Sequence, residues 1–468
     1  MATTVDEIDA DVVIMGGGLA GLASAIFLRN AGIQVLCIDP QGFPRYPLGE
    51  SFDWSSPGLL TKLGLSRDSL VRQGIATYKR KVVLVPLGTR PFDGRPSDAL
   101  HGRPFGFETM TLHADRRAFD EQLCDRARDC GVLLVQDRVT KVSNRADRIL
   151  SCSTRYGREI QARWFIDASG RSQLIRRALG IENRLYGLPK VCIWTYFPSD
   201  GRTGDPQLSQ KQVDATTLYG DTRPDYLRWI WEIPITSNEV SVGCVVPSAE
   251  VRNLSKQGLA PSAILRRYLG DFDRFSPLLD QVTESQMHTV SFQNYVCNRV
   301  SGENWLMVGE AAALADPLTA NGVTAALRHA EASASLIGSA LSREALPEEG
   351  RYLYNAKVKR MGEAFNDSIE TAAYDWPIRR GIHPVVAFRV YTLFSYLANA
   401  LYSKFRPETK RDVAILSAAT VVAQIWLRSW VVLGRTGELI RRSASFAPIR
   451  RSSSTVVKGD SELIDVPK

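Results

Sequence analysis

The sequence predicts an α/β fold in which a Rossmann-like parallel-sheet domain is interleaved with an antiparallel-sheet domain and followed by a C-terminal helical region. Near the N-terminus, two short apolar runs flank a segment with apolar residues at helical spacing. The middle of the chain alternates and is rich in Trp, Tyr, Thr and Val. After Pro347 the spacing of apolar residues is helical to about Arg435.

Length and composition agree with a globular protein. The 468 residues are 44% hydrophobic and 23% charged, which suggests two or three domains. The seven cysteines show neither disulfide-framework nor metal-ligand spacing, which favours reduced thiols, a cytoplasmic location and no metal site. The N-terminus is too polar for a secretory signal. The net charge of +8 is not combined with an aromatic and basic motif, so we expect no nucleic-acid partner.

The first elements form a βαβ unit. Residues Asp11–Met15 make a short apolar run that ends at glycines and indicates a buried strand. The segment Gly21–Ala31 has helical spacing and is closed by Gly32, and Val35–Ile38 reads as a second buried strand. Strand, helix and strand in this order indicate a parallel sheet.

Later segments complete both domains. We expect a helix over Asp115–Gly131, a strand over Val132–Val135, a mostly antiparallel sheet over Val191–Val246, a strand over Leu306–Val308 and a helix over Gly322–Leu341. The predicted nucleotide-binding domain is discontinuous and comprises residues 8–80, 110–185 and 290–345. The predicted substrate domain, helical region and disordered tail are residues 81–109 with 186–289, 346–435, and 436–468.

A glycine-rich turn follows the first strand. Gly16, Gly18 and Gly21 form a GxGxxG pattern between a strand and a helix. Gly16 permits the tight turn, Gly18 lets the backbone approach a pyrophosphate, and Gly21 lets the helix pack closely on the strand. Asp39 ends the second strand about 20 residues later, where a carboxylate can bind a ribose. This arrangement predicts a dinucleotide site.

Three further motifs indicate which dinucleotide cofactor binds. They are the segments Ala114–Asp120 (ADRRAFD), Phe165–Ser172 (FIDASGRS) and Leu306–Ala312 (LMVGEAA). Together with the glycine turn they resemble, in order, the motifs of FAD oxidoreductases built like para-hydroxybenzoate hydroxylase. The resemblance covers roughly residues 8 to 345 and implies FAD as the cofactor.

The same resemblance implies cofactor-binding residues. It implies that Arg116 lies near the flavin. It also implies that Glu310, at a position where the family has Asp, holds the ribityl chain. Asp167 belongs to the DASGR motif, and could instead be purely structural. The residues whose backbone lies beside the flavin ring would come from the loop 316–323, which contains Pro317, Gly322 and Val323.

Two segments narrow the resemblance to one branch. Residues Phe43–Ser51 (FPRYPLGES) are similar to the PRxxxGES segment of flavin-dependent halogenases, which implies a cofactor role for Arg45. Residues Trp229–Pro234 (WIWEIP) fit the WxWxIP pattern of that branch. Two Trp at i and i+2 on a strand share one face, so they could equally be core aromatics of a sheet.

Halogenases also carry a catalytic lysine. In that family, reduced flavin and O2 oxidise a halide to hypohalous acid, and a lysine amine delivers the halogen to an electron-rich ring. The segment Ala76–Lys81 lies where the family carries this lysine, and Lys79 fits best. Lys81 is the alternative, two residues on and therefore on the same face of a strand. The whole basic segment could also be a solvated strand end.

One loop departs from the halogenase pattern FxDPxxSSGV. Here the sequence is LADPLTANGV, so Leu314 replaces Phe while Ala320 and Asn321 replace the two serines. Because the family binds halide in this loop, the departure concerns the halide site and not the flavin site.

The C-terminal region contains two apolar, aromatic stretches. Neither Pro384–Ser403 nor Val413–Gly434 is a clean membrane span. We expect buried helices that cover a substrate cavity; the alternative is a peripheral membrane contact in which the arginines that follow approach anionic lipid.

These features predict an FAD-dependent oxidoreductase, halogenase-like, that uses reduced FAD and O2 on an electron-rich or lipophilic small molecule, free or tethered to a carrier protein. No separate NADPH-binding βαβ unit is evident, so a flavin reductase is a candidate partner. The alternatives are an FAD monooxygenase (hydroxylase) or dehydrogenase/reductase that needs no halide, and a flavoprotein that only docks a partner.

Overall fold

The computed structural model describes residues 10–41, 48–86, 97–98, 110–199, 215–221 and 226–375, with single helical positions at 418, 421, 422, 425 and 429. The chain divides into two compact units, Met1–Gln424 and Ile425–Lys468. Only Ile425 and Ser429 of the second unit are described, so the account below concerns the first unit.

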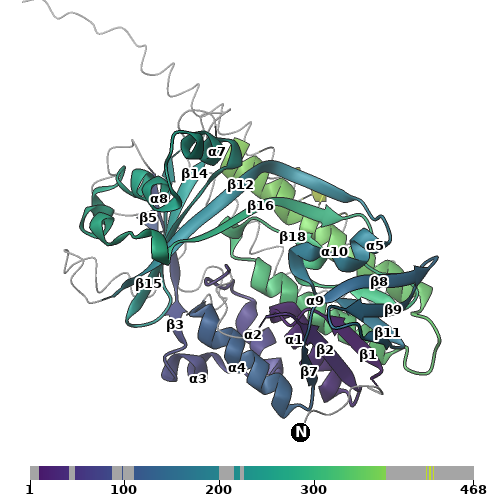
Figure 1. Cartoon of the computed structure of the whole chain (residues 1–468). Helices are drawn as coiled ribbons and strands as arrows, with labels where there is room; N and C mark the ends of the chain where they lie inside the picture. Colours follow the sequence, from purple (N-terminus) through teal and green to yellow (C-terminus); the bar gives the residue numbers. More distant parts are fainter. Residues whose placement is uncertain are drawn as a thin grey trace, which may run out of the picture. The chain divides into compact units, whose positions relative to one another are not determined.

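A parallel sheet has the strand order β17-β11-β1-β2-β7. Figure 1 labels β1, β2, β7 and β11 of this sheet. Its strands are β1 Val12–Met15, β2 Val35–Asp39, β7 Leu133–Gln136, β11 Trp164–Asp167 and β17 Trp305–Met307. Strands β1, β11 and β17 are buried throughout, as expected of strands covered on both faces. The predicted βαβ unit and the strands near 132 and 306 are therefore confirmed.

Helices pack around this sheet. The helix α1 follows the glycine turn and packs on α4 and α9. Their bounds are α1 Leu19–Asn30, α4 Arg116–Asp129 and α9 Gly322–Gly338. The side chain of Asp115 accepts a hydrogen bond from the Arg117 backbone N–H and so begins α4. All three helices lie within two or three residues of the predicted bounds.

The second large sheet has the order β18-β16-β12-β15-β14-β13-β4-β5. Its strands are β4 Lys81–Pro86, β5 Ser97–Asp98, β12 Asn183–Pro198, β13 Ala215–Asp221, β14 Arg228–Pro234, β15 Glu239–Pro247, β16 His288–Cys297 and β18 Ala313–Leu314. The pairs are antiparallel as predicted, except that β13 and β4 are parallel.

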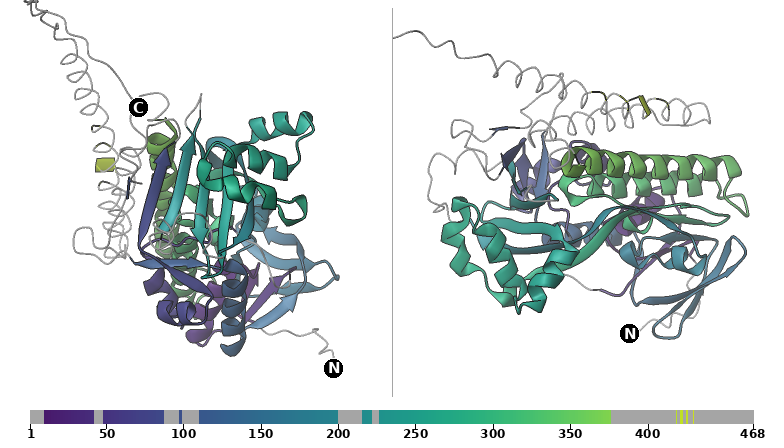
Figure 2. Two further views of the ribbon diagram at one scale, coloured as in Figure 1. Left: turned by 90° about the vertical axis from the view of Figure 1, so that its left-hand side faces the viewer. Right: turned by 90° about the horizontal axis from the view of Figure 1, so that it is seen from above.

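The two faces of this large sheet differ. One face packs on the helices α7 Ser248–Lys256 and α8 Pro261–Leu269 and on the 3₁₀ segment η3 Asp273–Gln281. The helix α10 Glu348–Ile369 runs along the sheet on its other side and continues as the π-helical turn η7 Glu370–Asp375 (Figure 2). The predicted helix after Pro347 is thus present to residue 375, and its predicted continuation and the tail lie outside the described residues.

Smaller elements complete the unit. The sequence did not predict a sheet of β8 Val139–Arg145, β9 Arg148–Thr154 and β10 Glu159–Gln161, or the pair β3 Ala76–Lys79 and β6 Thr111–Ala114. Short helical segments are α2 Ser56–Lys62, α3 Arg67–Arg72, η2 Gly170–Ser172, α5 Leu174–Ala178, η4 Glu284–Gln286, η5 Gly309–Ala311 and η6 Pro317–Thr319.

Candidate active site

The glycine turn between β1 and α1 is open where a phosphate would bind. Gly16 has φ +114°, and a Cβ atom on it would lie 2.3 Å from the Ala168 carbonyl oxygen. A Cβ on Gly21 would lie 1.9 Å from the Gly16 carbonyl oxygen. At Gly18, by contrast, a Cβ would meet nothing within 4 Å. The turn therefore needs glycine at two positions for packing and leaves an empty cradle at the third, where the N-terminus of α1 faces outward, as a pyrophosphate requires.

The carboxylate of Asp39 lies beside this turn. It accepts hydrogen bonds from the backbone N–H groups of Gly17 and, at 2.8 Å, of Gln41. The end of β2 is thus tied to the glycine turn, and the carboxylate stands where a ribose would lie against it.

Arg116 joins two of the motifs. Its guanidinium donates hydrogen bonds to the carbonyl oxygens of Leu48 at 3.0 Å and Gly49 at 3.2 Å, and pairs with Asp120 at 2.9 Å. A Cβ on Gly49 would lie 3.0 Å from Arg116 Nη1 and 3.6 Å from Val323 Cγ2. The GES segment, the DRxxFD segment and the start of α9 therefore meet here. The predicted residue Arg45 lies outside the described residues.

The other two predicted acidic residues, Asp167 and Glu310, have different surroundings. Asp167 is fully buried, and its carboxylate accepts hydrogen bonds from the Ser169 N–H and hydroxyl and from the Ile175 N–H. These bonds order the turn after β11. Glu310 is half exposed and lies 4.0 Å from Arg171 across the same edge of the sheet. Glu310 is thus the one of the two whose carboxylate is accessible to a ligand.

The loop before α9 is ordered by its own residues. Asp316 Oδ1 accepts a hydrogen bond from the Leu318 N–H at 3.0 Å, which begins the turn at Pro317. Ala320 closes that turn with φ +54°, a left-handed conformation that favours glycine or asparagine. A Cβ on Gly322 would meet nothing within 4 Å, so the N-terminus of α9 offers a second open helix end.

The same loop is anchored by a buried ionic cluster. Lys190 Nζ lies 2.8 Å from Asp316 Oδ2 and 3.2 Å from Glu370, and the Tyr374 hydroxyl donates to Asp316 at 3.0 Å. Burial by itself lowers the pKa of Lys190, but the two carboxylates raise it above its ordinary value. The cluster therefore holds a charged lysine and ties the loop to β12 and to the end of α10.

We expect Lys190→Met to lower the free energy of unfolding by about 3 kcal/mol, because Asp316 would stay buried without its cation. Urea denaturation measures this change. The control is Lys62→Met, because Lys62 pairs with Glu331 at the surface and such pairs contribute about 0–1 kcal/mol. An equal effect of both substitutions would contradict the prediction.

Lys79 ends β3 and is buried, with 3% of its surface exposed. Its amine donates hydrogen bonds to Ser51 Oγ at 2.7 Å and to the Phe52 carbonyl oxygen at 3.1 Å, and lies 5.2 Å from the centre of the Trp54 ring. Burial lowers the pKa of Lys79 to about 8, while the negative charge of Asp53 opposes this shift. The interpretation of this lysine as part of a solvated strand end is therefore wrong, and its amine loses its proton at a lower pH than that of an exposed lysine.

The alternative lysine occupies a different strand. Lys81 begins β4, which pairs with β13, whereas Lys79 ends β3, which pairs with β6. The two lysines therefore lie on different strands and not on one strand as predicted, because the chain passes from one sheet to the other at Arg80.

A chain of contacts connects Lys79 with the first turn of α9, which follows the loop 316–323. Asp53 accepts hydrogen bonds from the Ser55 N–H at 2.8 Å and from the hydroxyl of Thr324, the residue after Val323. Burial raises the pKa of Asp53, against the effect of the Thr324 hydrogen bond. The segment 48–56 thus spans the distance between the cofactor motifs and the lysine.

The two tryptophans of the WxWxIP motif share one face of β14, opposite α8. Their ring centres lie 5.8 Å apart and both are buried. Trp231 donates to Ser241 Oγ at 3.0 Å, and Trp229 donates to the Tyr374 hydroxyl at 3.1 Å. A Cβ on Gly243 would lie 2.3 Å from the Trp231 ring, so the strand beside it needs glycine. The predicted shared face is confirmed, and the packing role accounts for both rings.

Glu50 is a buried carboxylic acid next to Ser51. Its Oε1 has no hydrogen-bond partner among the described residues. Burial raises the pKa of Glu50 to about 7, although hydrogen bonds from Ser241 and Tyr196 favour the charged form. Glu50 and Lys79 thus both titrate near neutral pH within one short stretch of structure.

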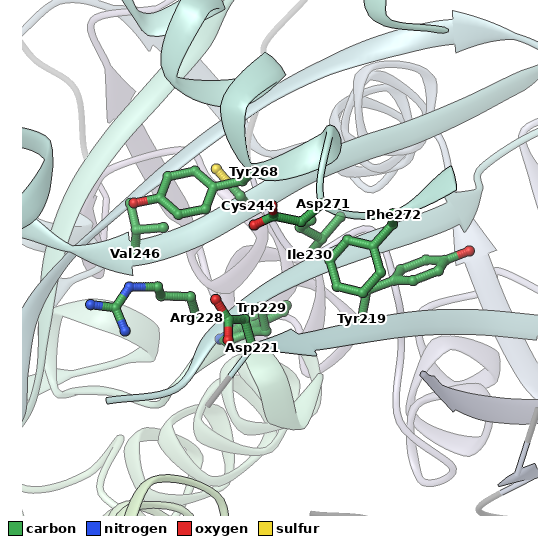
Figure 3. Close-up of a pocket in the computed structure, with 10 residues that line it drawn as sticks. All are labelled: Tyr219, Asp221, Arg228, Trp229, Ile230, Cys244, Val246, Tyr268, Asp271 and Phe272. Atoms are coloured by element: carbon green, nitrogen blue, oxygen red, sulfur yellow. The ribbon is translucent and has the colours of Figure 1, made fainter. Parts of the chain in front are cut away.

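A separate pocket lies on the helix-covered face of the large sheet (Figure 3). It is lined by Tyr219, Asp221, Arg228, Trp229, Ile230, Cys244, Val246, Tyr268, Asp271 and Phe272. Arg228 in its wall pairs with Glu250 at 2.6 Å. Neither Lys79 nor Trp231 lines this pocket, so it is not the candidate active site.

Several residues of the site were not predicted. They are His113 and Thr216, which lie beyond Ser51, and the Lys190, Asp316 and Glu370 cluster. One signal was available for Lys190, since a lysine at the start of the apolar run Val191–Trp194 is unusual for a buried strand. No group of His, Cys, Asp and Glu suited to a metal occurs in the part of the chain that the structure describes. Within that same part, no helix is long and apolar enough to cross a membrane.

The chain is similar to known protein families. The tryptophan halogenase family matches residues 101–376, and the FAD binding domain family matches residues 11–59. The tryptophan 2-halogenase of Chondromyces crocatus is 26% identical over 347 residues, which cover 71% of this chain and 62% of that protein. The 1H-pyrrole-2-carbonyl-[peptidyl-carrier protein] chlorinase of Pseudomonas fluorescens is 26% identical, over 69% of this chain and 74% of that protein.

Solved structures share the fold. The halogenase PltM has a TM-score of 0.71 at 16% identity, with 93% of each chain covered. The flavin-dependent halogenase CmlS has a TM-score of 0.66 at 22% identity, with 90% of this chain and 78% of that chain covered.

Proposed function

Because the chain belongs to the tryptophan halogenase family, we propose that it is an FAD-dependent halogenase that acts on an electron-rich small molecule. The observation that carries this proposal is the position of Lys79, buried and hydrogen-bonded to the segment that reaches the flavin loop. The aligned part spans less than two thirds of the first relative, so substrate and activity are inferred from the site and not transferred from that protein.

The cofactor motifs fit FAD. When bound and reduced, FAD reacts with O2 and supplies the oxidising power that converts a halide to hypohalous acid. Gly18 would leave room for the pyrophosphate, Asp39 would bind the ribose, and the half-exposed Glu310 would bind the ribityl chain. The open N-terminus of α9 at Gly322 favours a negatively charged or polar group beside it.

Lys79 would perform the transfer. Its neutral amine attacks the halogen of hypohalous acid, so that an N–halogen bond forms, the oxygen–halogen bond breaks, and the oxygen leaves as water with one amine proton. An electron-rich ring carbon then takes the halogen, and the ring proton restores the amine. Burial favours this role because it disfavours the ammonium form, which has no free electron pair.

This step predicts a pH dependence. Since the pKa of Lys79 is about 8, the yield of halogenated product per flavin oxidised should rise as the pH increases through 8 and then level off. Oxidation of free reduced FAD, measured alongside, corrects for changes in the flavin itself. A yield that falls through the same range would show that the ammonium is the active form.

A second function is favoured by one observation. Ala320 and Asn321 stand where the halogenase pattern has serines, and Ala320 has the positive φ that glycine or asparagine would adopt more readily. If this loop does not bind halide, the same cofactor site supports an FAD monooxygenase, or a dehydrogenase/reductase.

Mass spectrometry of products distinguishes these functions. The protein is supplied with reduced FAD, O2, bromide and a panel of indoles, phenols and pyrroles. A product with the bromine isotope pattern supports the halogenase. A hydroxylated product whose yield is independent of bromide supports the monooxygenase. If no substrate gives a product, the result supports the non-catalytic docking role.

The form of the substrate and the source of electrons belong to the same proposal. Two relatives bear names that specify a pyrrole attached to a peptidyl-carrier protein, which supports testing carrier-bound substrates as well as free ones. We infer a separate flavin reductase as the electron source. Activity with NADPH in the absence of a reductase would contradict that part.

A further inference from the structure

A line of buried side chains joins Lys79 to His113. Lys79 Nζ lies 2.7 Å from Ser51 Oγ, Ser51 Oγ lies 3.0 Å from Thr216 Oγ1, and Thr216 Oγ1 lies 2.8 Å from His113 Nε2. All four residues are at least nine-tenths buried. The two hydroxyl groups each have a single hydrogen, so the direction of each hydrogen bond depends on its neighbours.

The far end of the line fixes that direction. The Thr77 hydroxyl donates its hydrogen to the Pro234 carbonyl oxygen at 2.5 Å, because a carbonyl can only accept. Thr77 Oγ1 also lies 3.5 Å from His113 Nδ1, so in that contact it must be the acceptor. This contact is long for a hydrogen bond, but it favours the tautomer of His113 that carries its hydrogen on Nδ1 and presents Nε2 as an acceptor.

The donor and acceptor in each remaining hydrogen bond, from His113 back to Lys79, follow from this tautomer. Thr216 donates its hydrogen to His113 Nε2 and so must accept from Ser51, and Ser51 must accept from Lys79. A second N–H of Lys79 is held by the Phe52 carbonyl oxygen at 3.1 Å. Both N–H groups of the neutral amine are thereby donated, one to Ser51 and one to the Phe52 carbonyl oxygen. The electron pair of the nitrogen is left for the reacting halogen.

We propose that His113 is a positioning residue for Lys79, which acts through Thr216 and Ser51 to keep the Ser51 hydroxyl an acceptor. With the opposite direction, the Ser51 hydroxyl would donate to the neutral amine and occupy the electron pair that must take the halogen. This inference rests on the proposed function, since it assigns a partner to the proposed transfer residue.

The charges around this line are consistent with that role. Burial lowers the pKa of His113 well below its ordinary value, and the positive charge of Lys79 adds to this, so the imidazole is neutral. The negative charge of Asp53 raises the pKa of Lys79, but Asp53 is hydrogen-bonded to Thr324 and is not part of the line. Glu50 adjoins Ser51 in sequence, but its hydrogen bonds go to Ser241 and Tyr196. The line itself carries no negative charge, so its effect is orientation.

The central test is Thr216→Val, which keeps the shape and removes the hydroxyl. Freed from Thr216, the Ser51 hydrogen can turn to the amine, and we expect the yield of brominated product per flavin oxidised to fall about tenfold, the scale of one hydrogen bond. The matched control is Thr217→Val, because Thr217 is a buried neighbour on the opposite face of β13. Thr216→Ser should restore the yield, and His113→Phe should reproduce the loss.

A second measurement does not depend on bromination. The Cε chemical shift of Lys79, assigned by its absence in Lys79→Met protein labelled with ¹³C-lysine, is followed as a function of pH. In Thr216→Val and His113→Phe the Ser51 hydroxyl would stabilise the neutral amine, so the titration midpoint should fall below that of the unmodified protein. Thr217→Val and Thr216→Ser should keep the original midpoint.

The two readouts separate the two proposals. If the unmodified protein forms no brominated product, the proposed function fails, and the Lys79 titration still decides the role of His113. An unchanged midpoint in both Thr216→Val and His113→Phe, with FAD affinity and melting temperature retained, would overturn the inference. A lower midpoint in Thr217→Val as well would overturn it too, since the effect would then be a general loss of packing.

Discussion

Gly18→Val is expected to abolish FAD binding. Gly18 is the residue of the glycine turn whose Cβ position is empty, because it faces away from the protein at the N-terminus of α1. A valine side chain would fill the space that a pyrophosphate needs and keep it from the helix N–H groups. We expect the affinity to fall by about 1,000-fold or more, equal to about 4 kcal/mol, in a flavin fluorescence titration.

The matched control for this change is Gly338→Val. Gly338 ends α9, at the other end of the helix from the loop 316–323, and a Cβ there also meets nothing within 4 Å. This variant should bind FAD like the unmodified protein. Equal FAD affinity in Gly18→Val and Gly338→Val would refute the assignment of the cofactor site.

Lys79→Met is expected to abolish halogenated product while reduced flavin is still oxidised by O2. Methionine retains the buried apolar stem but has no amine to accept the halogen. Removal of the transfer group should lower the product yield by about 1,000-fold or more, within the range for a lost catalytic side chain. Product is measured by mass spectrometry, and flavin oxidation by absorbance in the same reaction.

Lys81→Met is the informative comparison, since Lys81 begins the next strand and was the alternative from the sequence. Full yield in this variant and loss in Lys79→Met would support the assignment. The reverse pattern would transfer the role to Lys81, and full yield in both variants would end the lysine proposal.

The cofactor part of the fold could be predicted because its signals are local. Gly16 and Gly21 are required within a single turn, and the buried strands beside them are continuous apolar runs. The same reasoning correctly placed Trp229 and Trp231 on one face, since alternation along a strand is also a local property.

The contacts around Lys79 could not be predicted, because they depend on pairing between distant strands. Nothing near Lys79 in the sequence indicates that β3 pairs with β6 and that β4 pairs with β13. For the same reason the sequence alone leaves open whether Lys79 is a buried transfer residue or part of a solvated strand end, and only the structure shows that it is buried. Lys190 shows the same limit, since its partners Asp316 and Glu370 are 126 and 180 residues away.

The parallel pairing of β4 with β13 has a consequence for how the protein folds. Antiparallel neighbours can form through a short turn, whereas this pair must wait until about 130 intervening residues have been placed. The contacts that reach Lys79 through Thr216 span 165 and 103 residues and so close large loops. Contacts of such long sequence separation form slowly. During refolding, the local βαβ unit of β1, α1 and β2 should therefore form before Lys79 is enclosed, and halogen transfer should recover only in a slow phase.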